Sequence, residues 1–311
     1  MSGAPCPWHE AAWMQLQQAQ RDGRLAPALL LSGPQGVGKR RFARALAKAG
    51  LCEDVQDGAC GQCGSCRQFE VGVHPDYLEI TIAPDKREIL IDQIREFTSA
   101  IQLTAGQGGR GRYGVILAAD RMNHAAANAL LKTLEEPPQG VRLLLTASQL
   151  GRMPATIRSR CSRMVLPMPS TDQSRAWLSR LDSPIDPRLV TPARGPCALE
   201  DLEQPAELLK REQSWASTLT QLRRQRDPMA AAKSVGEADC DRFIEWWQGR
   251  LLGGMKQGDE PVALRRLWDA LIQVRAQSHI AFNRLLVLEG LFILYLNLTQ
   301  DGPRQRGSIA T

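Results

Sequence analysis

The fold of this chain is decided by one stretch near its start, Ala28-Leu-Leu-Leu-Ser-Gly33-Pro-Gln-Gly36-Val-Gly38-Lys39. It opens on a short apolar run that is typical of a buried strand, and residues 39–51 then repeat apolar side chains at helical spacing. Between a strand and a helix, the N–H groups of a glycine-rich loop can surround a phosphate, and a lysine can reach the terminal phosphates of a nucleotide. We therefore predict a phosphate-binding loop with four candidate residues: Gly33, Gly36, Gly38 and Lys39.

The same loop lacks two parts that ATP hydrolysis needs. A Ser or Thr hydroxyl at position 40 would bind Mg²⁺, but this chain has Arg40, which has hydrogen-bond donors and no acceptor. The apolar run at residues 115–119 has no acidic pair at its end; Asp120 follows in a predicted loop, and we interpret it as the cap of the next helix. The sequence therefore predicts no ATP hydrolysis and leaves ATP binding open.

Strands and helices alternate outward from this loop. Further strands are predicted at 77–82, 113–118 and 141–147, and helices at 91–101 and 123–136, the last beginning at Asn123 and ending before Pro137. Alternation of this kind predicts an α/β fold with a mainly parallel sheet covered on both faces. Beyond residue 205 the pattern is helical, with helices predicted at 208–226, 239–252, 261–277 and 280–298. We predict three domains: 1–168, a small helical module at 169–204, and an all-α domain at 205–311.

Four cysteines stand close together in residues 52–66: Cys52, Cys60, Cys63 and Cys66. Two Cys-x-x-Cys turns supply soft ligands at a spacing that suits tetrahedral Zn²⁺. A ferredoxin-like iron–sulfur run would have its fourth thiolate after three further residues, where this chain has Glu70. We predict a structural zinc module over about 52–66, with an iron–sulfur cluster and unligated thiols as the alternatives. His74 is interpreted as a packing or turn residue.

Composition and charge exclude some classes of protein. The chain is 43% hydrophobic and 23% charged, which is typical of a folded protein, and it shows neither an export signal nor a membrane span, so we expect a cytoplasmic protein with no membrane partner. The net charge is +6. Residues 140–180 hold one acid and seven arginines, namely Arg142, Arg152, Arg158, Arg160, Arg163, Arg175 and Arg180. This run favours an anionic partner, or it is a solvated basic surface.

Several motifs together resemble one known family. They are the stretch at 28–39, the cysteine cluster followed by Gly72-Val-His-Pro-Asp76, the segment Ala125-Ala-Ala-Asn-Ala-Leu-Leu-Lys-Thr-Leu-Glu-Glu-Pro137, the segment Thr156-Ile-Arg-Ser-Arg-Cys161, and Asn283-Arg-Leu-Leu286. The chain resembles clamp-loader subunits of the AAA+ superfamily, and the damaged nucleotide motifs resemble the delta-prime family of bacterial DNA polymerase III. The resemblance is dense up to about residue 168 and thin afterwards.

The resemblance implies an architecture, a set of partners and a role. It implies an AAA+ domain, a helical lid and a C-terminal collar that joins subunits in a ring. Ser159-Arg160-Cys161 matches the motif whose arginine points into the ATP site of a neighbouring motor subunit, so Arg160 is the candidate catalytic residue, acting in trans. The implied partners are the gamma/tau motor subunits, the delta subunit and, through the complex, the sliding clamp and primer–template DNA. The implied role is that of a stator without ATPase activity of its own.

Two other functions remain as alternatives. The chain could be a working ATPase subunit of a clamp loader that uses Asp120 and Arg40 in unconventional roles. It could also be a zinc-dependent nucleic-acid-binding protein, although the cysteine cluster has only Phe69 and Arg67 to contact a nucleic acid. For a lid arginine that senses the nucleotide, Arg194 is a candidate.

Overall fold

The computed structural model describes residues 5–54, 58–84, 86–102, 111–180, 189–190, 195–200, 205–255, 262–276 and 283–300. The chain divides into two compact units: Met1–Gln173 with Gly195–Ala198, and Ser174–Arg194 with Leu199–Thr311. Over these described ranges, every helix is too short or too polar to cross a membrane. Arg194, the candidate lid arginine, lies outside the described residues.

The first unit is built on a five-stranded sheet in which every paired neighbour is parallel. Its order is β2-β3-β4-β1-β5, from strands β1 (Ala28–Ser32), β2 (Tyr77–Ile80), β3 (Arg112–Ile116), β4 (Val141–Ala147) and β5 (Ser162–Val165). The predicted α/β class with a parallel sheet is confirmed. Strand β1 lies between β4 and β5, with Leu29 opposite both Leu144 and Ser162, so the loop after β1 leaves the interior of the sheet.

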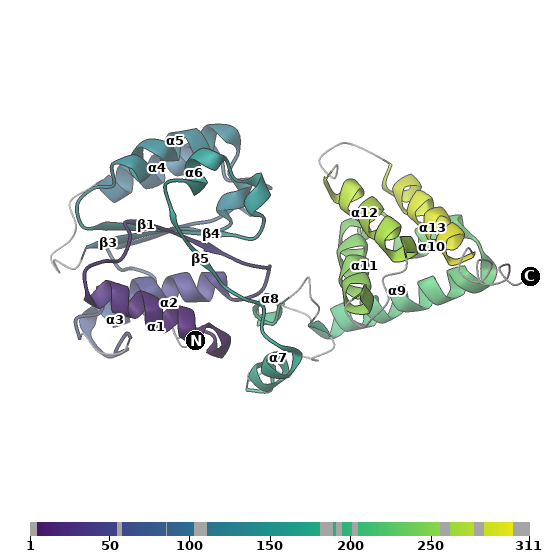
Figure 1. Cartoon of the computed structure of the whole chain (residues 1–311), viewed down its shortest axis with the longest axis horizontal. Helices are drawn as coiled ribbons and strands as arrows, with labels where there is room; N and C mark the ends of the chain where they lie inside the picture. The colour runs from purple at the N-terminus through teal and green to yellow at the C-terminus, as the bar shows by residue number, and fades with distance from the viewer. Residues whose placement is uncertain are drawn as a thin grey trace, which may run out of the picture. The chain divides into compact units, whose positions relative to one another are not determined.

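Helices cover both faces of this sheet (Figure 1). One face carries α1 (Glu10–Arg21), α2 (Lys39–Leu51) and α3 (Gly64–Glu70); the other carries α4 (Ile91–Gln102), α5 (His124–Glu135) and α6 (Ala155–Arg158). Successive side chains of a strand alternate between faces. Accordingly Leu29 and Leu31 pack with Phe42 in one core, and Leu30 packs with Leu130 in the other.

Short helical segments complete the first unit and lead toward the second. Three 3₁₀ turns lie at Pro7–His9 (η1), Ala119–Arg121 (η2) and Leu150–Arg152 (η3). Helices α7 (Thr171–Leu178) and α8 (Cys197–Glu200) fall within the module predicted at 169–204. The residues of this module are shared between the two compact units, so the division of the chain into three domains stays a prediction.

The second unit is helical and has an aromatic core. Its helices are α9 (Pro205–Gln225), α10 (Pro228–Val235), α11 (Cys240–Met255), α12 (Val262–Ala276) and α13 (Arg284–Gln300). Phe243 is fully buried at the centre of this core, with ring centroids of Trp215, Trp247 and Phe292 all within 5.7 Å of its own. The four predicted helices are present, and α10 was not predicted.

Candidate functional site

The predicted phosphate loop lies between the end of β1 and the start of α2, as its sequence indicated. Gly36 and Gly38 have φ angles of 73° and 101°, a backbone region that residues with a Cβ rarely adopt. Gly33 lies so close to the segment after β5 that a Cβ there would be 2.3 Å from the Leu166 carbonyl oxygen. The glycines are therefore required by the loop itself, and Gly33, Gly36, Gly38 and Lys39 occur together in it.

Lys39 contacts the loop that precedes it. Its Nζ donates hydrogen bonds to the carbonyl oxygens of Gly33, at 2.8 Å, and of Pro34, at 2.7 Å. Burial lowers the pKa of Lys39 to about 8, although the nearby carboxylate of Asp120 acts in the opposite direction. Protein carbonyl groups of the predicted phosphate loop therefore engage the charged lysine.

A distant segment packs directly on the loop. The backbone N–H of Gly195 donates to the carbonyl of Gln35 at 3.0 Å, and that of Cys197 donates to the carbonyl of Gly36 at 2.9 Å. A Cβ on Gly36 would lie 2.6 Å from the Gly195 carbonyl oxygen, so the two backbones are in close contact. This contact joins residues far apart in the sequence, and nothing in the local pattern of residues 195–198 predicted it.

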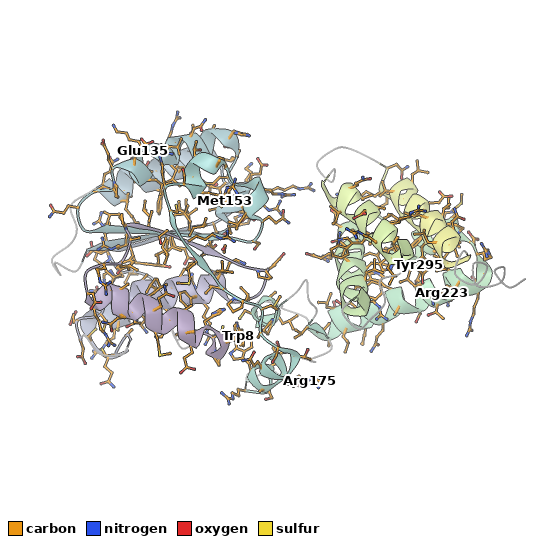
Figure 2. All side chains as sticks on the ribbon, in the orientation of Figure 1. Trp8, Glu135, Met153, Arg175, Arg223 and Tyr295 are labelled. Atoms are coloured by element: carbon orange, nitrogen blue, oxygen red, sulfur yellow. The ribbon has the colours of Figure 1, made fainter. Side chains whose placement is uncertain are left out.

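The N-terminal residues close the loop from another direction. Trp8 (Figure 2) donates from Nε1 to the carbonyl oxygen of Val37 at 3.0 Å, and the Cys6 Sγ lies 3.3 Å from the Cys197 Sγ. His9 is buried against Phe42, and burial, helped by the charge of Lys39, lowers its pKa to about 4. The phosphate loop is therefore enclosed by residues of its own chain on two sides.

A change at Lys39 gives a stability prediction with a defined pH dependence. The pKa of about 8 in the folded chain is below the value of about 10.4 expected on unfolding, so between these pH values the unfolded chain binds more protons and folded-state stability rises with pH. Below pH 8 the buried charge is unfavourable. We expect the unmodified chain to gain about 1–3 kcal/mol of stability relative to Lys39→Met between pH 7 and pH 10, because the variant has no titrating group at this position.

Urea denaturation at pH 7 and at pH 10 measures this difference. Lys132→Met is the matched control, since Lys132 is exposed on α5 and its replacement is expected to change the unfolding midpoint little at either pH. A stability difference between Lys39→Met and the unmodified chain that is the same at pH 7 and pH 10 would contradict the lowered pKa of Lys39.

Two charged residues near the loop have other partners. Arg40 and Arg44 both pair with Glu79 of β2: the Arg40 Nη2 is 3.3 Å from a Glu79 carboxylate oxygen, and the Arg44 Nε is 2.6 Å from one. Arg40 is thus drawn toward strand β2.

Asp120 does not cap the following helix, which corrects the prediction. Its Oδ2 accepts a hydrogen bond from the Gln149 N–H at 2.9 Å. Asn123 caps α5 instead, by accepting from the Ala126 N–H.

Arg160 lies on the sheet face that carries α5 and α6. Its Nη2 forms an ion pair with the Glu135 Oε1 at the end of α5, and its Nη1 donates to the Thr156 carbonyl oxygen at 3.0 Å. The Arg160 side chain is 34% exposed. Burial raises the pKa of the adjoining Cys161 thiol to about 11, so Cys161 is a poor nucleophile at neutral pH.

The four clustered cysteines converge on one point. Their Sγ atoms all lie within 4.8 Å of one another, with Cys52–Cys63 at 3.9 Å and Cys60–Cys66 at 4.0 Å. Cys52 follows the end of α2, and Cys63 caps the start of α3 by accepting from the Cys66 N–H. The group could hold a metal ion.

His74 lies outside the cysteine cluster. Its Nδ1 accepts a hydrogen bond from the Asp76 N–H, which fits the predicted turn role.

Comparison with known proteins identifies relatives of the chain. A family model described as "DNA polymerase III, delta subunit" matches residues 8–170. DNA polymerase III subunit delta′ of Pseudomonas aeruginosa is 30% identical over 95% of this chain and 98% of that protein. The delta′ subunit of Yersinia pestis is 31% identical over 90% of this chain and 85% of that protein. The tau subunit of Escherichia coli K12 is 36% identical over 51% of this chain and 24% of that protein.

A solved structure has a similar fold. It is a DNA polymerase III gamma subunit-related protein of Thermotoga maritima, with a TM-score of 0.51 and 18% sequence identity. The match covers 91% of this chain and 99% of that one. At this identity the likeness concerns the fold alone.

Proposed function

The chain belongs to the delta′ family of DNA polymerase III clamp-loader subunits, and we propose that it is a stator that does not hydrolyse ATP and supplies Arg160 to a neighbouring ATPase subunit. One observation carries the proposal. The cation at position 160 is held on a partly exposed turn, while the chain's own phosphate loop is enclosed by residues 195–198 and by the N-terminal segment.

Three features make hydrolysis in the chain's own loop unfavourable. Arg40 replaces the hydroxyl that would bind Mg²⁺ and pairs with Glu79. Asp120 uses one carboxylate oxygen on the Gln149 backbone. Lys39 is bound to two loop carbonyls, which a triphosphate would have to displace. An active AAA+ ATPase subunit is the alternative function.

An arginine beside a γ-phosphate contributes by electrostatics. The guanidinium carries a permanent charge and several N–H donors in a rigid plane, so it stabilises the charge that develops on the transferred phosphoryl group. Fingers of this kind are worth about 10³ to 10⁵ in rate in GTPases. In this role Arg160 is catalytic at a neighbour's nucleotide and has no part in any reaction at residues 33–39.

The cysteine cluster is proposed to hold a structural Zn²⁺. With Zn–S bonds of about 2.3 Å, a tetrahedral site has sulfur–sulfur distances of about 3.8 Å, close to the two distances given above. Four thiolates fill the tetrahedron, so the ion would keep no open position for chemistry. The ion would cross-link the end of α2 to the start of α3 and so stabilise this part of the first unit.

The proposed partners follow from the family. They are the gamma/tau motor subunits and the delta subunit and, through the assembled loader, the sliding clamp and primer–template DNA. The helical second unit, α9–α13, is proposed as the collar that joins the subunits. The cytoplasm is the proposed compartment.

ATP turnover by the purified chain tests the stator proposal. We expect phosphate release no faster than from buffer, and a clear rate only when the chain is assembled with its motor subunits. A parallel titration with a fluorescent ATP analogue reports whether the enclosed loop binds nucleotide. Brisk turnover by the chain alone that Lys39→Ala abolishes would instead support the alternative of a working ATPase.

A further inference from the structure

The partner of Arg160 lies on another element of the same chain. Glu135 is the last residue of α5, and its carboxylate forms the ion pair with the Arg160 guanidinium (Figure 2 labels Glu135). The Thr156 carbonyl takes a second guanidinium nitrogen. Building on the proposed finger role, we infer that Glu135 is a positioning residue that orients Arg160 for the neighbouring subunit's ATP.

Both ends of this pair are attached to rigid structure. Ile157 is fully buried, and the Arg160 N–H donates to its carbonyl oxygen at 3.2 Å, so the turn that carries Arg160 is fixed to the core. Leu134, beside Glu135, is 4% exposed, and Pro137 stops the helix soon after. The ion pair therefore joins two backbone positions that are held by the core. Rotational freedom remains only in the side chains of Glu135 and Arg160.

The chemistry of the pair suits positioning. An arginine side chain loses rotamer entropy when it is fixed, and a carboxylate that holds one edge of the guanidinium removes part of this loss before ATP binds. Nη1 and Nη2 of Arg160 each donate one N–H hydrogen to these partners. A guanidinium has five N–H hydrogens, so donors remain for a phosphate. Because the Glu135 and Arg160 side chains are 48% and 34% exposed, their ion pair should add little to folding stability.

ATP hydrolysis by the reconstituted loader, with primed DNA and clamp present, tests this inference. Glu135→Ala is expected to lower kcat of the site that receives Arg160 by about tenfold, with KM, assembly and thermal stability unchanged, since a small misplacement of a catalytic group is costly. Glu135→Gln keeps an oxygen acceptor and should recover most of the loss. Glu136→Ala, at the exposed neighbouring position, is the matched control and should not change kcat.

A double variant separates positioning from a structural role. In an Arg160→Ala background, Glu135→Ala should cause no further loss, because its effect acts through the guanidinium. The inference is overturned if Glu135→Ala leaves kcat unchanged or raises it while Arg160→Ala lowers it, or if the two losses multiply. If neither variant changes kcat, the finger role itself fails and the positioning role fails with it.

Discussion

Replacing Arg160 by Ala is expected to leave the clamp loader fully assembled and to reduce clamp loading on primed DNA at least tenfold. If Arg160 has the proposed finger role, the variant removes a cation from the neighbouring ATP site, and in GTPases such a group is worth about 10³ to 10⁵ in rate. Other ATP sites in the loader keep their own residues, so total ATP hydrolysis should fall less than the rate at the affected site. Clamp loading is expected to fall further than total ATP hydrolysis if it requires the affected site.

The control for this experiment is a second arginine close by in the sequence. Arg158 is exposed at the end of α6, two residues away, and belongs to the same basic run. Arg158→Ala should retain nearly full clamp loading at physiological salt. If the two variants lose activity equally, the effect belongs to the general positive charge of residues 140–180, and the finger assignment is wrong.

Loss of the proposed Zn²⁺ is expected to have the largest effect on stability. Cys63→Ser should lower the zinc content from one ion per chain to nearly none and destabilise the first unit by about 3 kcal/mol or more, because structural zinc contributes its binding energy to folding. The damage should concentrate where the cluster ties the end of α2 to α3, and hydrogen exchange at residues 45–51 and 64–70 would locate it.

A buried cysteine outside the cluster provides the comparison. Cys240, 2% exposed in α11, lies in the second unit, and Cys240→Ser should keep the zinc. Zinc is counted by metal analysis of the purified chains. An unmodified chain that carries iron with a visible absorption band would favour the iron–sulfur alternative, and one that carries no metal and loses no stability in Cys63→Ser would favour unligated thiols.

Elements with a strong local pattern could be predicted from the sequence. The strand, loop and helix around residues 28–51 were predicted because an apolar run, a glycine spacing and a helical repeat follow one another directly. Strand β5 was missed because it is an edge strand, Ser162-Arg-Met-Val165, with three of its four residues exposed. Helix α1 was missed because only Leu16 and Gln17 of its residues are buried, which leaves a weak apolar repeat.

Helix α10 was missed for a different reason. Asp227-Pro228 was interpreted as a break between helices, whereas Asp227 caps a new helix by accepting from the Ala230 N–H, and Pro228 occupies its first turn. Asp227 and Pro228 do separate two helices, but they also form the start of the second of them. The break was correct, and the eight-residue helix that follows it was overlooked.

The candidate site was predictable in its composition but not in its contacts. The loop glycines, Lys39, the four cysteines and Arg160 were all identified from spacing and motif. The closure of the loop by Gly195 and Cys197, and the pairing of Glu135 with Arg160, depend on how distant segments pack. No local pattern encodes such contacts.

The central claim is that this chain's own nucleotide loop is dispensable for catalysis while its arginine is not. The most direct test compares steady-state ATP hydrolysis, in the presence of primed DNA and clamp, by loaders that carry Lys39→Met or Arg160→Ala in this subunit alone. We predict an unchanged rate for Lys39→Met and a clear loss for Arg160→Ala. The opposite pattern, a loss with Lys39→Met and none with Arg160→Ala, would contradict the claim.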